Sequence, residues 1–169
     1  MALDNCALGP GFSQALSSFS TEYIRTMSNP LPHPTDVIPH RDPFLFLDGV
    51  TELEPGVSAK GFWIPGDDLP FFAGHFPGRP TLPGVLMAES IAQLGAYAVL
   101  HGESFAGKIP MFGGLDNAKF RRQVSPGERL DLELTVTRMS ARAGKASGRA
   151  LVDGELACSC DLMFVGVAL

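Results

Sequence analysis

Cysteine is scarce in this sequence, and its placement argues against a disulfide framework. The 169 residues include 3 cysteines, Cys6, Cys158 and Cys160, an odd number without a Cys-x-x-Cys pair. Cys158 and Cys160 are two positions apart, so on a strand both would point to the same face instead of bridging two elements. Free thiols of this kind are typical of a reducing compartment, and we expect a cytoplasmic protein.

The sequence also lacks a basic charge balance and a long apolar run. Its 13 Lys and Arg against 18 Asp and Glu give a formal net charge of -5, which argues against a nucleic-acid partner. The most apolar segment, residues 85–100, carries Glu89 and Gln93 and is too short to span a membrane. No basic stretch followed by an apolar one opens the chain, so no secretory signal is predicted. The 4 histidines have no ligand spacing with a third donor, so no metal site is expected.

Two regions differ in pattern. Residues 1–34 place apolar side chains at helical spacing before a proline-rich stretch, which predicts an N-terminal extension with an amphipathic helix and a linker. Met27 is an alternative start of translation within it. Residues 35–169, in a chain that is 45% hydrophobic and 18% charged, are expected to form one folded domain.

The domain alternates strands with one apolar helix. A hairpin is predicted from Phe44 around the Pro55-Gly56 turn, and prolines and glycines over residues 64–84 predict a long, rigid loop. Pro83-Gly84 then opens a helix that extends to about Leu100, and at least three strands follow. Because this helix is apolar on every side, its natural cover is a sheet wrapped around it. The prediction is an α+β fold with a long buried central helix wrapped by an antiparallel β-sheet.

Three features of this helix and the loop before it could carry chemistry. Glu89 lies in the apolar helix, where burial raises the pKa of a carboxyl group and suits it to donate a proton. His75, in Gly-His-Phe-Pro-Gly, is held in the stiff loop. Gly84 and Val85 open the helix, whose free N–H groups could hold a carbonyl oxygen that gains negative charge. Taken alone, Glu89 could lie at a subunit seam or be hydrogen-bonded for packing, His75 could be structural or merely exposed, and Gly84 could be an ordinary helix start. Their occurrence within 15 residues favours a site.

A local basic cluster lies in the segment after the helix. Lys119, Arg121 and Arg122 surround Phe120 in a chain that is acidic overall. Such charges usually serve solubility, but this patch could dock an acidic carrier.

Three longer segments resemble a known family. IPHRDPFLFLDGV, GHFPGRPTLPGVLMAESIAQLGAY and GGLDNAKFRRQVSPGERLDLELTV are similar to the 3-hydroxyacyl-[acyl-carrier-protein] dehydratases of bacterial type II fatty acid synthesis, the FabZ type. The similarity covers about residues 37–164. It implies a hot-dog fold, no cofactor, and a homodimer that is often assembled as a trimer of dimers.

The resemblance also implies roles for individual residues. His75 matches the catalytic histidine, and Glu89 matches the catalytic glutamate that the other subunit of the dimer contributes. Gly84 matches the glycine whose N–H binds the thioester carbonyl. The expected reaction is dehydration of a (3R)-3-hydroxyacyl chain on acyl carrier protein to the trans-2-enoyl product, in fatty acid or related specialised acyl-chain synthesis. The acyl tunnel is expected to include Phe72, Phe76, Val85, Leu86 and Phe112.

Other functions remain open at this stage. A hot-dog acyl thioesterase would hydrolyse the thioester, and a dehydratase/isomerase would also move the double bond, although that family has aspartate at the position of Glu89. A non-catalytic acyl-carrier-binding subunit is the third alternative. The N-terminal extension is not typical of the family, and acyl chain length does not follow from the sequence.

Overall fold

A computed structural model of the chain describes residues 30–102, 105 and 107–168. The amphipathic helix expected near the N-terminus and the alternative start at Met27 lie outside the described residues. From Pro32 onward the chain forms one compact unit. Within it, the Tyr97 hydroxyl donates a hydrogen bond to the Pro32 carbonyl at 2.9 Å, which ties the start of the unit to its core.

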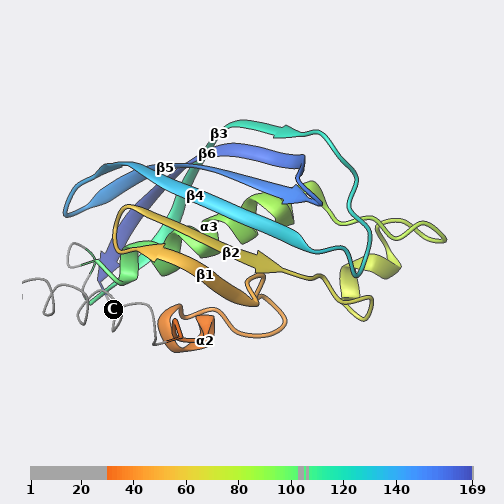
Figure 1. Cartoon of the computed structure of the whole chain (residues 1–169), viewed down its shortest axis with the longest axis horizontal. Helices are drawn as coiled ribbons and strands as arrows, with labels where there is room; N and C mark the ends of the chain where they lie inside the picture. The colour runs from red at the N-terminus through yellow and green to blue at the C-terminus, as the bar shows by residue number, and fades with distance from the viewer. Residues whose placement is uncertain (1–29, 103–104, 106, 169) are drawn as a thin grey trace, which may run out of the picture. The chain divides into compact units, whose positions relative to one another are not determined.

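Six antiparallel strands form a single sheet in the order β1-β2-β4-β5-β6-β3 (Figure 1). Their bounds are β1 Gly49–Glu54, β2 Ser58–Trp63, β3 Lys108–Phe120, β4 Leu130–Met139, β5 Ala143–Val152 and β6 Glu155–Ala168. Strands β4, β5 and β6 follow one another through tight turns, and Gly154 at the β5–β6 turn has a φ of 80°, which glycine adopts without strain. Strand β3 instead pairs with β6 at an outer edge of the sheet.

One long helix, α3 (Gly84–Leu100), packs against the sheet. It contacts all six strands, and Ile91, Leu94 and Tyr97 on it are completely buried. Each such side chain contributes about 1.5–3 kcal/mol to stability by leaving water. Figure 1 shows the sheet curving around α3. This confirms the predicted hot-dog fold. None of the described helices has the length and apolar character needed to cross a bilayer.

Close contacts at glycines fix how α3 lies on the sheet. A Cβ atom at Gly148 of β5 would lie 2.3 Å from Ile91 Cγ2, and one at Gly61 of β2 would lie 3.1 Å from Leu94 Cδ1. From the helix side, a Cβ at Gly95 would lie 2.9 Å from Leu134 Cδ1. Strand and helix side chains therefore interlock at positions where glycine leaves room.

The sequence predicts a helix that is buried on every side, but the structure leaves one face of α3 partly exposed. Val85 is 64% exposed, and Glu89 and Ala92 are half-buried, whereas most other residues of α3 are buried. The three positions are spaced by four and three residues, so they lie along one stripe of the helix. The sheet therefore covers this stripe only in part.

The predicted first strand begins later than expected. Residues 44–48 are not in a strand; β1 starts at Gly49. The backbone groups that a strand would have paired find other partners, since the Phe46 N–H donates to Gln93 Oε1 at 2.8 Å and the Phe44 carbonyl accepts from Gln93 Nε2 at 3.2 Å. A buried side chain of α3 thus replaces a neighbouring strand.

The predicted long loop before α3 is confirmed. It contains a short 3-10 helix, η1 (Pro70–Ala73), and otherwise turns. Two bonds tie its end to the β3–β4 connection: the Leu82 N–H donates to the Val124 carbonyl at 2.7 Å, and Arg79 Nη2 donates to Gln123 Oε1 at 2.8 Å. A short helix, α2 (Pro34–Val37), precedes the first strand and contacts α3.

Candidate active site

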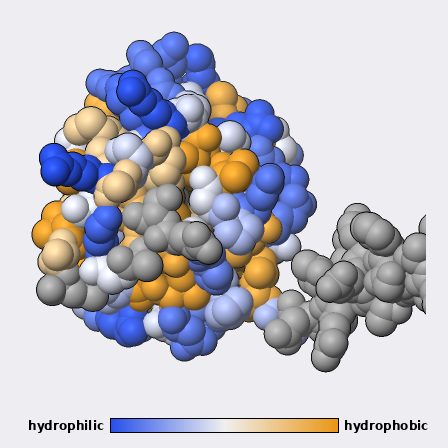
Figure 2. Space-filling view, turned by 90° about the vertical axis from the view of Figure 1, so that its left-hand side faces the viewer, coloured by the Kyte–Doolittle hydropathy of each residue, from blue (hydrophilic) through white to orange (hydrophobic). Residues whose placement is uncertain are grey.

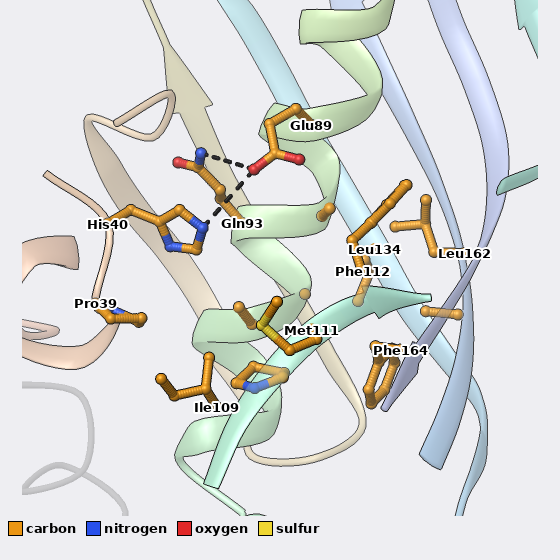
Figure 3. A pocket seen from close by; sticks show the side chains of 15 residues that line it. Pro39, His40, Glu89, Gln93, Ile109, Met111, Phe112, Leu134, Leu162 and Phe164 are labelled. Carbon is orange, nitrogen blue, oxygen red and sulfur yellow. Dashed lines mark hydrogen bonds and ion pairs between the residues drawn. The ribbon is translucent and has the colours of Figure 1, made fainter. Parts of the chain in front are cut away.

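Glu89 lies at the edge of an apolar cavity. The cavity has a volume of about 320 Å³ and lies between α3, β3 and the inner face of the sheet. Figure 3 shows Glu89 and His40 at one part of it and apolar side chains around the rest. Among the described residues that line it, Glu89 is the one carboxylic acid. The apolar lining consists of Pro39, Ala92, Gly95, Ala96, Ile109, Pro110, Met111, Phe112, Leu134, Ala146, Leu162 and Phe164.

The Glu89 carboxylate is anchored through one oxygen. Gln93, one helical turn further along α3, donates from Nε2 to Glu89 Oε1 at 3.0 Å. Gln93 is fully buried and its amide also holds the backbone at Phe44 and Phe46. The other oxygen, Oε2, has no hydrogen-bond partner in the part of the chain that the structure describes, and Figure 3 shows it directed away from Gln93 and His40.

His40 approaches the same carboxylate oxygen from the segment before β1. Its Nε2 lies 3.8 Å from Glu89 Oε1, too far for a hydrogen bond but close enough for strong electrostatic interaction. Burial lowers the pKa of His40 below the usual value of an imidazole, against the opposing effect of the Glu89 carboxylate. His40 is therefore mainly neutral near pH 7.

His75 lies outside the Glu89 cavity of its own protomer, because it is absent from the residues that line this cavity. Its ring is half-buried, and its Nδ1 lies 2.7 Å from the Thr81 carbonyl oxygen. Since a carbonyl only accepts, Nδ1 carries the proton, and in the neutral ring the lone pair is on Nε2. The ring stacks on Phe76, with centroids 4.1 Å apart. The loop thus presents His75 with one nitrogen ready to accept a proton.

Gly84 begins α3, and no side chain caps this end. The first N–H groups of a helix have no partner within the helix. A Cβ at Gly84 would lie 2.9 Å from the Phe120 ring, so close packing of that ring is one reason for glycine here. Of the predicted substrate-binding residues beside it, Val85 is exposed and Leu86 is half-buried.

The other predicted tunnel residues lie in different surroundings. Phe112 lines the Glu89 cavity. Phe72 is 3% exposed in the core, and Phe76 is 55% exposed in the loop. Neither of these two lines that cavity, nor do Val85 and Leu86. Within one protomer the structure therefore brings Phe112 and Glu89 together, and His75, Phe72 and Phe76 are elsewhere.

The predicted carrier-docking residues also differ in their surroundings. Arg122 is held by Glu128 at 2.8 Å and Glu155 at 3.0 Å, so its charge is neutralised locally. Lys119 and Arg121 are exposed and line a polar groove of about 440 Å³. Within the described part of the chain, neither forms a salt bridge.

Two residues of the site were not predicted from sequence. Gln93 is the one carboxamide residue of the apolar helix, and its spacing of four from Glu89 already places both on one helix face. His40 had no such signal, because its contact with Glu89 joins segments 49 residues apart in the chain. Only the fold brings that imidazole to the carboxylate.

Comparison with known proteins agrees with the fold and the motifs. A family model described as a FabA-like domain matches residues 38–161. A 3-hydroxyacyl-[acyl-carrier-protein] dehydratase FabZ from Staphylococcus carnosus is 47% identical over 76% of this chain and 89% of its own length. Another from Clostridium novyi is 50% identical over 76% of this chain and 91% of its own.

A solved structure described as the dehydratase heterocomplex ApeI:P from Xenorhabdus doucetiae has a TM-score of 0.70 at 18% identity, over 81% of this chain and 92% of that one. At this identity the likeness shows the fold. The sequence relatives go further: the chain belongs to the FabA-like family, among its FabZ members.

Proposed function

We propose that this protein dehydrates (3R)-3-hydroxyacyl chains carried on acyl carrier protein to the trans-2-enoyl product, in fatty acid or related acyl-chain synthesis. The observation that carries the proposal is one carboxylic acid, Glu89, anchored at a mainly apolar cavity. Such a cavity suits an acyl chain, and the acid suits the departure of a hydroxyl group from its head. The FabZ relatives share the sequence over most of the domain.

The reaction needs three groups, and the chain offers each. A base removes the proton at C2, and the Nε2 lone pair of His75 serves this step because Thr81 holds the proton on Nδ1. The carbonyl oxygen gains negative charge, which the Gly84 N–H at the start of α3 stabilises. Glu89 donates a proton to the departing hydroxyl at C3 through Oε2, since Oε1 is engaged by Gln93. A water molecule and the enoyl thioester leave.

The active unit is a homodimer whose sites are shared. Within a protomer His75 does not line the cavity of Glu89, so the partner subunit supplies the histidine. The partly exposed stripe of Val85, Glu89 and Ala92 and the edge strand β3 are surfaces that a second copy would cover. Exposed apolar side chains on β3 are Met111, Phe112, Leu115 and Phe120. Figure 2, which views the molecule from the left-hand side of Figure 1, shows hydrophobic residues in orange among hydrophilic residues in blue on this face. A trimer of dimers remains a further prediction.

The carrier docks on the exposed charges Lys119 and Arg121. These side chains have no acidic partner in the described part of the chain, unlike Arg122, so they can attract an acidic carrier domain. Strand β3 holds Lys119 next to Phe120, which packs on the start of α3. The carrier would thus lie near the Gly84 end of the helix. A cytoplasmic location is part of the same proposal.

Complementation between two inactive variants tests the shared site. Glu89→Gln and His75→Ala should each reduce dehydration of a 3-hydroxyacyl thioester by at least about 100-fold, while the proteins stay folded. When the two are co-expressed or refolded together at equal amounts, half of the dimers are mixed, and each mixed dimer has one complete site. The mixture should regain roughly a quarter of wild-type activity.

Two outcomes would contradict this proposal. If the mixture regains no activity although mixed dimers are isolated, His75 and Glu89 act within one protomer or not together. If Glu89→Gln alone keeps full dehydration, the acid role is wrong. Release of free thiol by the wild-type protein, without an enoyl product, would favour a thioesterase instead.

A further inference from the structure

The cavity that holds Glu89 contains a second titratable side chain, His40. Of the described residues lining the cavity, only these two have an acidic or basic side chain. His40 lies near the start of the segment between α2 and β1, and Glu89 lies in the second turn of α3. Figure 3 shows the His40 ring directed toward the carboxylate.

The two nitrogens of His40 have different environments. Nδ1 is buried and has no hydrogen-bond partner in the described part of the chain, whereas Nε2 faces Glu89 Oε1 at 3.8 Å. A buried N–H without an acceptor is costly, so the neutral ring carries its proton on Nε2. That N–H then points toward the carboxylate oxygen that Gln93 also holds.

We propose that His40 is a positioning residue for Glu89: its neutral imidazole directs the Nε2–H at Oε1 across 3.8 Å, which electrostatically favours the orientation in which Oε1 faces His40 and Oε2 is directed to the substrate. This inference rests on the role of Glu89 proposed above. Gln93 and His40 approach the same oxygen from different segments, and together they restrict rotation of the carboxyl group.

The charge of His40 matters for this role. A protonated His40 would form an ion pair with Glu89 and hold it as a carboxylate, which cannot donate a proton. Burial lowers the pKa of His40, and the neighbouring Arg41 acts in the same direction, while Glu89 opposes both. Glu89 and Arg41 are the charged groups that face His40 from α3 and from its own segment. The ring therefore stays mostly neutral in the pH range of catalysis.

Reciprocal titration tests the coupling without any activity assay. Histidine-labelled full-length wild-type protein is titrated by NMR, and the His40 signal is assigned by its loss in His40→Gln. In the substrate-free protein the negative charge of Glu89 favours imidazolium, and Glu89→Gln removes that charge, so the His40 titration should move to lower pH by roughly 0.5 unit or more. An unchanged His40 titration would overturn the proposal, because it would mean that the two side chains do not interact.

Kinetics of matched variants test the positioning. Glutamine carries an amide N–H near the position of Nε2 but does not titrate, so His40→Gln should keep kcat within about 3-fold of the wild type. His40→Leu should lower kcat by roughly 10- to 100-fold with KM nearly unchanged. His101→Gln, at the other end of α3, is the control and should keep wild-type kinetics.

The outcomes separate this inference from the proposed function. Equal losses in His40→Gln and His40→Leu, with both proteins folded by circular dichroism, would assign His40 to packing. If His40→Leu does not fold, His40→Gln and the titration still decide. If the wild type itself does not dehydrate 3-hydroxyacyl thioesters, the proposed function fails, while the titration still shows whether His40 and Glu89 are coupled.

Discussion

Gln93 joins the fold and the site, and its replacement should measurably lower the stability of the protein. In Gln93→Leu a side chain of similar size fills the space, but the buried Phe46 N–H loses its acceptor and the Phe44 carbonyl loses a donor. An unsatisfied buried N–H costs about 1–3 kcal/mol, and the lost bond to the carbonyl adds about 1 kcal/mol. The free energy of unfolding should therefore fall by about 2–4 kcal/mol.

Thermal unfolding at equal protein concentration measures this loss. At roughly 3 °C per kcal/mol for a domain of this size, Tm should fall by about 6–12 °C. The control is Ser90→Ala, a second fully buried polar residue of α3, whose hydroxyl donates only to the Met87 carbonyl of its own helix at 2.9 Å. Its loss should cost less than about 1 kcal/mol. Equal Tm values for Gln93→Leu and the wild type would refute the reasoning that this amide replaces a strand.

Two further predictions concern surface charges. Arg121→Glu should raise KM for carrier-linked substrate by about 10-fold but leave KM for a small thioester analogue unchanged. The control is Arg142→Glu, at an exposed charge in the β4–β5 turn, which should change neither KM. Equal effects of Arg121→Glu on both substrates in steady-state assays would argue against docking at Arg121. Hydrogen bonds from the Arg122 guanidinium, which has the larger effect, and from the Ser125 N–H lower the pKa of Glu128 below its ordinary value of 4.5. The stabilisation from Glu128 is thus complete above pH 4.5 and is lost as the pH falls through the lowered pKa that Glu128 has in the folded protein. The urea midpoint should therefore drop less steeply with acid in Glu128→Gln than in the wild type. Parallel curves for the two proteins would contradict this.

The pattern of the sequence predicts the fold well because local signals agree with the tertiary structure. The apolar helix begins at Gly84 after Pro83, as a proline at a helix start indicates, and the strands after it follow turn residues such as Gly154. The first strand is the exception. Phe44–Leu47 has the composition of a strand, but its backbone is paired by a glutamine 47 residues away, which no local pattern reveals.

The site is predictable only in part. Glu89 stands out in the sequence because burying a carboxylate in an apolar helix costs free energy unless the group is paired or protonated. His75 and Gly84 stay predictions, since neither lines the cavity of Glu89 in the single chain. His40 reaches Glu89 only through the packing of its segment on α3. Contacts between segments that are distant in the chain cannot be predicted from local sequence patterns.

The glycine contacts between α3 and the sheet constrain how such a protein can change its substrate range. With Ile91 seated over Gly148 and Leu134 over Gly95, turning the helix or sliding it along its axis would produce backbone collisions. Under the proposed function, a longer or shorter acyl chain has to be accommodated by exchanging individual cavity side chains, such as Phe164 or Leu162, around Glu89. Selection can then alter chain length one side chain at a time while the chemistry at the head of the substrate stays intact.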